Sequence, residues 1–223
     1  MNKVFIETYG CQMNVYDSEL VISILQKEGW QLCDSIESAD MILVNTCSIR
    51  DNAEQRVWGR LDHFLQQKRK RVELIVGVLG CMAERVKEKL LEHPVVNIVA
   101  GPDTYRKLPE MIRDLQSEPK QMDIRLSRHE TYADITPVRT DKNGVSAYIS
   151  IMRGCNNMCT YCIVPYVRGS ERSRDPHSIV KEARDLFESG YREVNLLGQN
   201  VDSYLWVDPE NPTERSEERR VGK

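Results

Sequence analysis

The chain has 223 residues, of which 40% are hydrophobic and 29% are charged, with 12 Gly and 9 Pro. This ordinary globular composition excludes a disordered, collagen-like or low-complexity chain. The 31 basic and 34 acidic residues give a formal net charge of −3, so the bulk composition does not support a large nucleic-acid-binding surface. No apolar run approaches the roughly 20 residues that span a bilayer, and Glu7 lies where a signal peptide would have its apolar core. We therefore expect a cytoplasmic protein whose 7 cysteines serve metal binding or catalysis rather than disulfides.

The first half of the sequence alternates between strand and helix patterns. Runs of strand length and apolar character occur at 4–9, 41–45, 74–79 and 97–100. Each run precedes a segment with helical spacing of its apolar residues, at about 17–27, 51–70, 83–91 and 103–115. Strand, turn and helix repeated in this order predict an α/β domain with a doubly wound parallel sheet, which we place in residues 1–116.

The second half begins another unit of the same kind. Residues 117–143 lack the alternation and are interpreted as a linker with some short strand content. A strand at 147–151, a helix at 176–189 and a strand at 193–197 then predict the start of a parallel β/α barrel within residues 144–207. Because such a barrel takes about 200 residues or more, we expect the chain to be a fragment. The charged tail, 208–223, is a candidate for unrelated junction sequence.

Three cysteines form a C-x3-C-x2-C group, Cys155, Cys159 and Cys162, after the first strand of the second unit. Three thiolates this close together can hold three irons of an iron–sulfur cube, whereas ordinary electron-transfer clusters use four cysteines. The fourth iron would then be free to bind a substrate group. Structural zinc normally needs a further ligand pair, for which only His177 is a candidate, and a disulfide is not expected in the cytoplasm. The spacing therefore favours an iron–sulfur cluster.

A second group consists of Cys11, Cys47 and Cys81, each of which comes just after a predicted strand. Any one of them could be a buried core thiol. The carboxyl ends of the strands in an open parallel sheet, however, meet in one crevice, which is the usual ligand site. The shared position therefore predicts a second site with three thiol ligands. Cys33 lies outside this pattern and is assigned to packing.

With these motifs, the chain resembles the radical S-adenosylmethionine (SAM) methylthiotransferases over about residues 3–206. The resemblance is carried by Thr-Tyr-Gly-Cys-Gln-Met-Asn at 8–14 with Asp-Ser-Glu at 17–19, Asn-Thr-Cys-Ser-Ile-Arg at 45–50, Gly-Cys-Met-Ala at 80–83 and the segment 153–174 around the second cysteine group. Tyr161, the aromatic residue before Cys162, also fits the radical SAM pattern. Gln-Met-Asn at 12–14 is similar to the branch that makes 2-methylthio-N6-isopentenyladenosine in tRNA, whereas the ribosomal-protein branch typically has Pro-Lys-Asn there.

The resemblance implies two [4Fe-4S] clusters and SAM as cofactors. The cluster on the C-x3-C-x2-C group would bind SAM and cleave it to a 5′-deoxyadenosyl radical, which takes hydrogen from C2 of an N6-isopentenylated adenosine in the tRNA anticodon stem-loop. The cluster on Cys11, Cys47 and Cys81 would carry the sulfur that is methylated by a second SAM and delivered to that carbon. No side chain is implied as an acid or base. The implied SAM contacts are Tyr161, Arg174, Gly198, Gln199 and Asn200.

The resemblance also implies a reducing partner such as flavodoxin or ferredoxin, no membrane association and a monomer. Four arginines near the cysteine loop, Arg153, Arg168, Arg172 and Arg174, could bind the SAM carboxylate or tRNA phosphates, or form a solvated basic face. Family members continue into further barrel strands and a small C-terminal β domain, so this chain is expected to be inactive alone. Two alternatives stay open: a methylthiotransferase for a ribosomal protein, and a non-catalytic iron–sulfur or zinc-binding module.

Overall fold

A six-stranded parallel sheet forms the first part of the molecule in the computed structural model, which describes residues 2–47, 51–140 and 144–208. Its strands are β1 (Lys3–Tyr9), β2 (Gln31–Leu32), β3 (Met41–Thr46), β4 (Ile75–Gly80), β5 (Ile98–Ala100) and β6 (Gln121–Asp123), in the spatial order β2-β1-β3-β4-β5-β6. The central strand β3 is buried along its whole length, as expected where both faces of a parallel sheet are covered. The predicted parallel sheet is confirmed. β2 and β6 extend it beyond the four predicted strands, β6 from within the segment interpreted as a linker.

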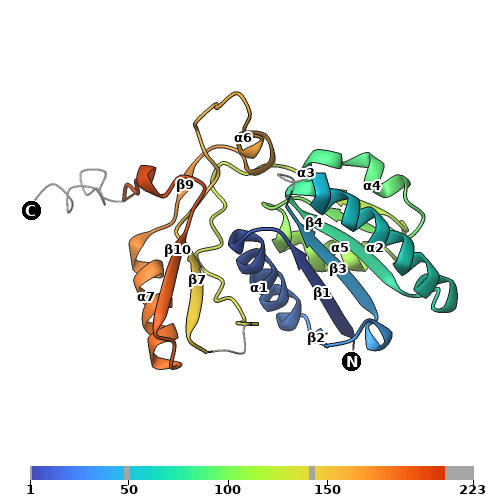
Figure 1. The fold of residues 1–223 in the computed structure, drawn as a ribbon. Coiled ribbons are helices and arrows are strands. Elements are labelled where there is room, and N and C mark those ends of the chain that lie inside the picture. Colours follow the sequence, from blue (N-terminus) through green and yellow to red (C-terminus); the bar gives the residue numbers. More distant parts are fainter. Residues whose placement is uncertain (1, 48–50, 141–143, 209–223) are drawn as a thin grey trace, which may run out of the picture.

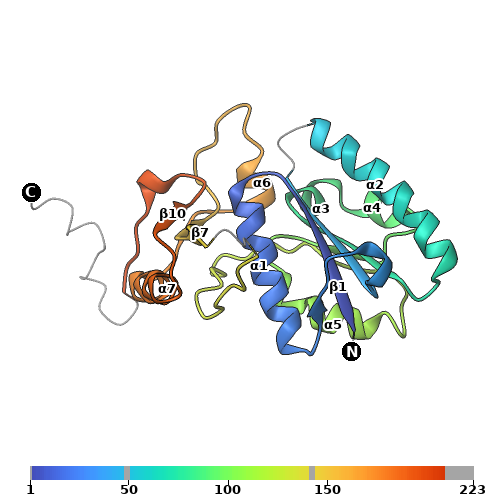
Figure 2. The same cartoon turned by 60° about the horizontal axis from the view of Figure 1, so that its bottom comes forward.

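Helices cover both faces of this sheet (Figures 1 and 2). On one face lie α1 (Gln12–Lys27) and α5 (Leu108–Asp114), where Leu20 and Met111 share a core with Leu43 of β3. On the other face lie α2 (Asp51–Lys70), α3 (Cys81–Val86) and α4 (Glu88–Glu92), where Phe64 packs in a core with Ile42. Because successive residues of β3 point to opposite faces, the strand contributes to both cores. The doubly wound fold predicted from the sequence is confirmed.

The helix boundaries differ from the predicted ones in three places. α1 begins at Gln12, five residues before the expected start at 17, with Cys11 as its N-cap. The helix expected at 83–91 is divided into α3 and α4 at Lys87, whose φ is +54°. The helix expected at 103–115 begins with a 3₁₀ turn, Tyr105–Lys107, before α5. A further 3₁₀ turn spans Ile36–Ser38.

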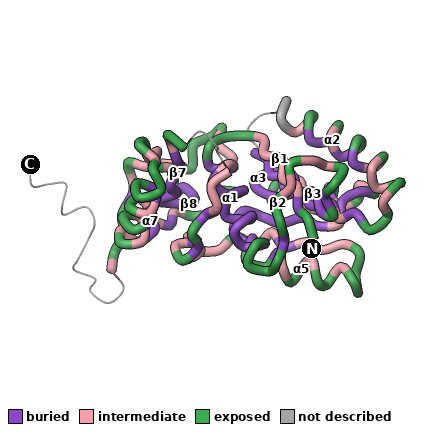
Figure 3. Tube along the Cα trace, turned by 90° about the horizontal axis from the view of Figure 1, so that it is seen from below, coloured by how far each residue is buried: buried purple, intermediate pink, exposed green. Residues whose placement is uncertain are grey.

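α1 is buried on nearly its whole circumference, which a helix on the surface of a sheet would not be. The reason is that it lies between the sheet and the second unit, whose Tyr148 and Leu197 pack against the same core as α1 (Figure 3). Its polar residues Asp17 and Glu19 are therefore also buried. In the first turn of α1, Met13 and Asn14 are buried and Gln12 is exposed.

The second unit is built on a parallel pair of strands, β7 (Ser146–Ser150) and β10 (Glu193–Leu197), with α7 (Pro176–Glu188) packed on them. Between them lie β8 (Met152–Arg153), α6 (Val164–Arg168) and β9 (Arg172–Ser173), and a 3₁₀ turn, Val201–Ser203, follows β10. The three predicted elements of this unit are confirmed, and a parallel pair connected through a helix is the start of a β/α barrel. In the described residues, no helix has both the length and the apolar character needed to cross a membrane. The predicted domain limits remain predictions, and the tail, 209–223, lies outside the described residues.

Candidate functional site

The structure brings Cys11, Cys47 and Cys81 together at one edge of the sheet. They follow β1, β3 and β4, three adjacent parallel strands, at their carboxyl ends. Since β2 and β3 lie on opposite sides of β1, the winding of the chain reverses between β1 and β3, and such a switch point is where open α/β sheets bind ligands. All three cysteines line one cavity of about 260 Å³. The predicted convergence of the three thiols is thus observed.

Tight glycine turns let the thiols approach one another. Gly10 and Gly80 precede two of the cysteines with φ of +141° and +86°, values that side chains other than glycine rarely adopt. A Cβ on Gly10 would lie 2.6 Å from the Cβ of Cys47, and one on Gly80 would lie 2.4 Å from Oδ1 of Asn45. Asn45 in turn donates from Nδ2 to the carbonyl oxygen of Asn14 at 2.9 Å. Buried amides and glycines therefore fix the end of β3 against the start of α1.

The three thiols differ in their electrostatic surroundings. A hydrogen bond with Cys47 lowers the pKa of Cys11 to about 5, although burial opposes the change. Burial raises the pKa of Cys81, although the guanidinium of Arg168, whose Nε donates to Cys81 Sγ at 3.1 Å, acts in the opposite direction. The thiolate is the form that binds metals. A donor and a positive charge therefore already lie beside the most buried of these thiols.

The remaining wall of the cavity comes mainly from the second unit. It is lined by residues of α1, of α6 and of the end of β10: Gln12, Met13, Val164, Val167, Arg168, Leu197, Gly198 and Gln199. Gly198 and Gln199, two of the predicted SAM contacts, thus face the thiols of the first unit. Oε1 of Gln199 is buried and has no hydrogen-bond partner in the part of the chain that the structure describes. Asn200 does not line the cavity, and its carbonyl oxygen accepts a hydrogen bond from Ser203 Oγ at 2.8 Å.

The second cysteine group lies on a loop that projects beyond the sheet ends, next to α6 (Figure 1). Cys155 is its fixed end: it is buried, and its N–H donates to the carbonyl oxygen of Gly169 at 3.1 Å. Cys159 is exposed and Cys162 is half-buried, and Tyr161 is 90% exposed. None of these residues lines the cavity of the first group. The proposed SAM contact of Tyr161 therefore remains a prediction.

The first cysteine group fits an iron–sulfur cluster by the chemistry of its donors. In the described ranges, no three Cys, His, Asp or Glu side chains are already arranged around a metal position. The cavity nevertheless presents three thiols, which are the soft ligands that iron–sulfur clusters use. Nη1 of Arg168 is buried beside them without a hydrogen-bond partner among the described residues. An unsatisfied cationic donor next to a set of thiols suits an anionic cluster.

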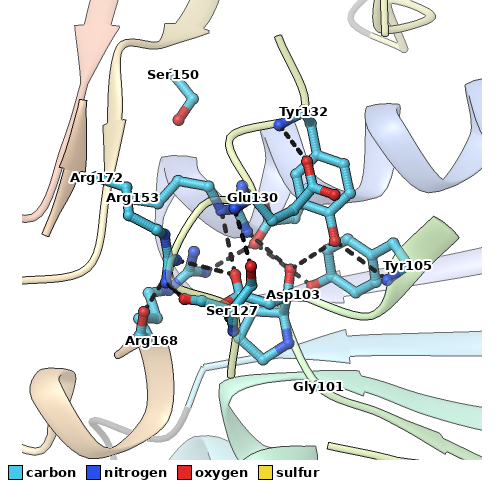
Figure 4. Close-up of polar contacts among 12 residues, drawn as sticks. Gly101, Asp103, Tyr105, Ser127, Glu130, Tyr132, Ser150, Arg153, Arg168 and Arg172 are labelled. Carbon is cyan, nitrogen blue, oxygen red and sulfur yellow. Dashed lines mark hydrogen bonds and ion pairs between the residues drawn. The ribbon is translucent and has the colours of Figure 1, made fainter. Parts of the chain in front are cut away.

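The arginines around the cysteine loop are buried, so the alternative of a solvated basic face is wrong. Asp17 of α1 pairs with Nη1 of Arg153 and with Nη2 of Arg168, both at 2.8 Å. Arg172 pairs with Asp103 at 3.0 Å, and Figure 4 shows Arg153 and Arg172 beside Asp103, with Arg168 next to them. Burial would raise the pKa of Asp17, but the two guanidiniums hold it below its ordinary value. These arginines connect the two units.

Arg174, a predicted SAM contact, lies in a second buried group. Its Nη1 pairs with Glu182 and donates to the hydroxyl oxygen of Tyr16 at 3.1 Å. Arg139 adds a pair with Glu182 at 2.5 Å and one with Glu19 of α1 at 2.9 Å. A SAM contact of Arg174 remains a prediction, but its guanidinium is already occupied by protein groups.

The acidic partners of these arginines were missed from the sequence. Asp17, Asp103, Glu19 and Glu182 each look like an ordinary surface acid when a single helix or turn is considered. One signal is present in the sequence. Asp17 and Glu19 lie within α1, next to its apolar residues, so a helix that is buried on all sides has to bury these two carboxylates as well. The arginine partners of Asp17 and Glu19, Arg153 and Arg139, lie more than 100 residues away along the chain, and no local pattern reveals such pairs.

Comparison with known proteins supports both halves of the resemblance. Residues 3–101 match the model of "Uncharacterized protein family UPF0004", and residues 149–220 match that of the "Radical SAM superfamily". The second match implies an iron–sulfur cluster and SAM as cofactors. Together with the similar curated proteins described next, these matches confirm the resemblance to the radical SAM methylthiotransferases stated from the sequence motifs. Of its motif residues, 48–50 lie outside the described residues.

Similar curated proteins carry the name "tRNA-2-methylthio-N(6)-dimethylallyladenosine synthase". The chain is 60% identical to the one from Amoebophilus asiaticus over 204 residues, which is 91% of this chain and 42% of that protein. It is 57% identical to the one from Bacteroides fragilis (91% and 44%) and 51% identical to the one from Azobacteroides pseudotrichonymphae (96% and 47%). The chain thus spans less than half the length of the curated relatives it matches, as expected where only the start of a barrel is present.

Proposed function

We propose that this chain is the first part of a radical SAM transferase that adds a methylthio group to C2 of N6-isopentenyladenosine, next to the anticodon of tRNA. The observation that carries the proposal is the shared cavity, in which Cys11, Cys47 and Cys81 of the first unit face Gly198 and Gln199 of the barrel unit. A cavity walled by both units is what an enzyme needs if a sulfur-bearing group on one unit is to meet a substrate activated on the other. The names of the similar proteins support the same reaction.

The proposed cofactors are two [4Fe-4S] clusters and SAM. When bound, the clusters and SAM supply the radical chemistry and the sulfur. Cys155, Cys159 and Cys162 would hold one cluster and leave an open iron position for SAM, while Cys11, Cys47 and Cys81 would hold the other. The protein's own contribution is to fix three thiols at the switch point, to keep the charges behind them away from water and to position two units around one cavity.

The remaining partners follow from this chemistry. We propose that tRNA binds through the anticodon stem-loop, that a flavodoxin- or ferredoxin-type protein supplies electrons, and that the enzyme acts as a monomer in the cytoplasm. Tyr161, 90% exposed on the cysteine loop, is available for a ligand at the loop cluster. Gly198 and Gln199 line the shared cavity, which supports a contact with a ligand there.

Anaerobic reconstitution with iron and sulfide tests the two metal sites. We expect the chain to bind about eight iron atoms and each of Cys47→Ala and Cys159→Ala to bind about half as many. Cys33→Ala is the matched control, because Cys33 lies outside both groups and should keep the full iron content. An iron content that is unchanged in Cys47→Ala contradicts the first-unit site. Zinc bound in place of iron after expression in iron-rich medium would favour the non-catalytic module.

The substrate is tested on the natural protein by mass spectrometry of tRNA and ribosomal proteins from a deletion strain. We expect the methylthio group to disappear from tRNA while the ribosomal proteins stay unchanged. Loss of a methylthio group from a ribosomal protein instead would establish the alternative branch. Formation of 5′-deoxyadenosine from SAM by the reduced protein separates both enzymes from a non-catalytic module.

A further inference from the structure

Arg168 occupies an unusual position between a proposed cluster ligand and a buried carboxylate. Its Nε donates to Cys81 Sγ at 3.1 Å, and its Nη2 pairs with Oδ2 of Asp17 at 2.8 Å. The third nitrogen, Nη1, is buried and has no hydrogen-bond partner among the described residues. We propose that Arg168 is a positioning residue that orients the Cys81 thiolate and raises the reduction potential of the cluster on Cys11, Cys47 and Cys81. This inference rests on the proposed function, because it requires that cluster.

The charge of the buried network supports the proposal. Asp17 and Asp103 contribute two negative charges, and Arg153, Arg168 and Arg172 contribute three positive ones, with each of the five residues at most 8% exposed. The aromatic residues packed with them, such as Tyr105 and Tyr132, are neutral because burial raises their pKa. The network therefore has one surplus positive charge. Arg168, whose Nε donates to Cys81 Sγ, places positive charge of this network next to the thiols.

Arg168 belongs to the second unit and connects it with the first. It is the last residue of α6, and it follows Cys162 of the cysteine loop by six residues. Asp17, which fixes its guanidinium, belongs to α1, whose N-cap is Cys11. A single side chain thus connects the segment after one cysteine group with a ligand of the other. Any displacement of α6 changes the hydrogen bond to Cys81.

A hydrogen bond from a cation to a ligand thiolate has a defined redox effect. Reduction adds one negative charge to a cluster, and a nearby positive donor stabilises that charge more than it stabilises the oxidised form. Hydrogen bonds to the sulfurs and the net charge around a cluster are among the features that set its potential. Because Arg168 is buried, solvent screens this effect less than it would at the surface. Loss of the guanidinium should therefore lower the potential.

The test uses the full chain in a Cys155→Ala, Cys159→Ala, Cys162→Ala background, in which the first-unit site is the only one left. After anaerobic reconstitution, the midpoint potential is measured by redox titration followed by electron paramagnetic resonance. We expect Arg168→Gln to shift the midpoint to a more negative value and Arg168→Lys, which keeps the charge, to shift it less. Arg172→Gln is the matched control. Its arginine is equally buried and pairs with Asp103, but makes no contact with a cysteine sulfur among the described residues, so Arg172→Gln should shift the midpoint clearly less than Arg168→Gln.

An Arg168→Gln midpoint equal to that of the parent overturns the inference, and so does an equal shift in Arg172→Gln, which would show a general effect of the network. If Arg168→Gln does not fold, the iron–cysteine stretching bands in the resonance Raman spectrum of Arg168→Lys decide the question. Bands that shift against the parent support the hydrogen bond to Cys81, and unchanged bands overturn it. A parent that forms no cluster overturns the proposed first-unit site itself, and this result is distinct from a cluster with an unchanged potential.

Discussion

The two cysteine groups are built in opposite ways. Cys11, Cys47 and Cys81 stand at the ends of three paired strands, and the sheet holds them around one cavity. Cys155, Cys159 and Cys162 lie within eight residues of one loop, and only Cys155 is buried. The first site therefore owes its geometry to long-range packing, whereas the second depends on the local chain and on the metal it binds.

This difference fits the roles proposed for the two sites. A cluster that passes a sulfur to a substrate benefits from a fixed position in a walled cavity, since a small displacement of a reacting atom is costly. A cluster that has to admit SAM to an open iron benefits from an accessible loop. Behind the first site, Asp17 forms buried ion pairs with Arg153 and Arg168, and these pairs fix the position of the site.

The largest effect is expected from removal of Asp17, the carboxylate behind the first site. Asp17→Ala leaves Arg153 and Arg168 buried without their shared partner, and breaking such a buried pair costs about 3–5 kcal/mol. Chemical denaturation monitored by circular dichroism measures the change in free energy of unfolding. Asp134→Ala is the control: its carboxylate is 70% exposed in a pair with Arg106, so the loss should be about 0–1 kcal/mol. Equal losses in the two variants would contradict the claim that the first site rests on a buried network.

The next largest effect concerns the fixed end of the loop. Gly154 has a φ of +74°, and a Cβ there would lie 2.1 Å from the carbonyl oxygen of Ser170 and 2.6 Å from that of Gly169. Because both are backbone atoms, Gly154→Ala should cost about 3 kcal/mol in thermal or chemical denaturation. Gly190→Ala shares the positive φ, at +97°, but meets no atom within 4 Å, so it should cost only about 1 kcal/mol. A Gly154→Ala variant as stable as Gly190→Ala would show that Cys155 is not anchored.

A smaller effect is expected in how much iron binding slows hydrogen exchange at the two sites. On reconstitution, hydrogen exchange of the amides around Cys159 and Cys162 should slow by about tenfold or more, because the metal orders an exposed loop. Cys81 and the three residues after it are buried at the start of α3, so the amides there should change little. Hydrogen-exchange mass spectrometry of the chain with and without iron measures both. Equal slowing at the two sites would mean that the first site is no more preorganised than the second.

The fold was predictable because most of its helices and strands can be recognised from the pattern of a few neighbouring residues. β3 and β4 are continuous apolar runs, and the two cysteine groups could be located from strand ends and from spacing. The predicted start of α1 is too late because its first turn mixes polar and apolar residues, and the buried Asp17 has its charged partners, Arg153 and Arg168, in the other unit. Such partners are invisible to a local pattern.

The candidate site was predictable only in part, for the same physical reason. That the thiols after β1, β3 and β4 would meet followed from the topology of a parallel sheet. That Arg168 would contact Cys81 did not, since the two residues are 87 positions apart and belong to different units. Gly198 and Gln199 were expected to contact SAM, and their position opposite the first-unit thiols depends on how the two units pack.

The smallest predicted effect tests the surroundings of Cys81 in the metal-free chain. Glu84 lies one turn along α3, and burial raises its pKa to about 7 from an ordinary 4.5. Between these two values Glu84 holds its proton in the folded chain and is ionised in the unfolded chain, so the contribution of Glu84 to the free energy of unfolding falls as pH rises from about 4.5 to 7. Glu84→Gln removes this titration and should be more stable than the parent above pH 7, by on the order of 1 kcal/mol. Glu88→Gln, an exposed change on α4, should keep the parent's pH dependence, measured by urea denaturation at pH 5 and pH 8. If Glu84→Gln loses stability over this pH range as steeply as the parent, burial does not raise the pKa of Glu84. The helix that carries Cys81 would then be more open to water than the packing of the first site requires.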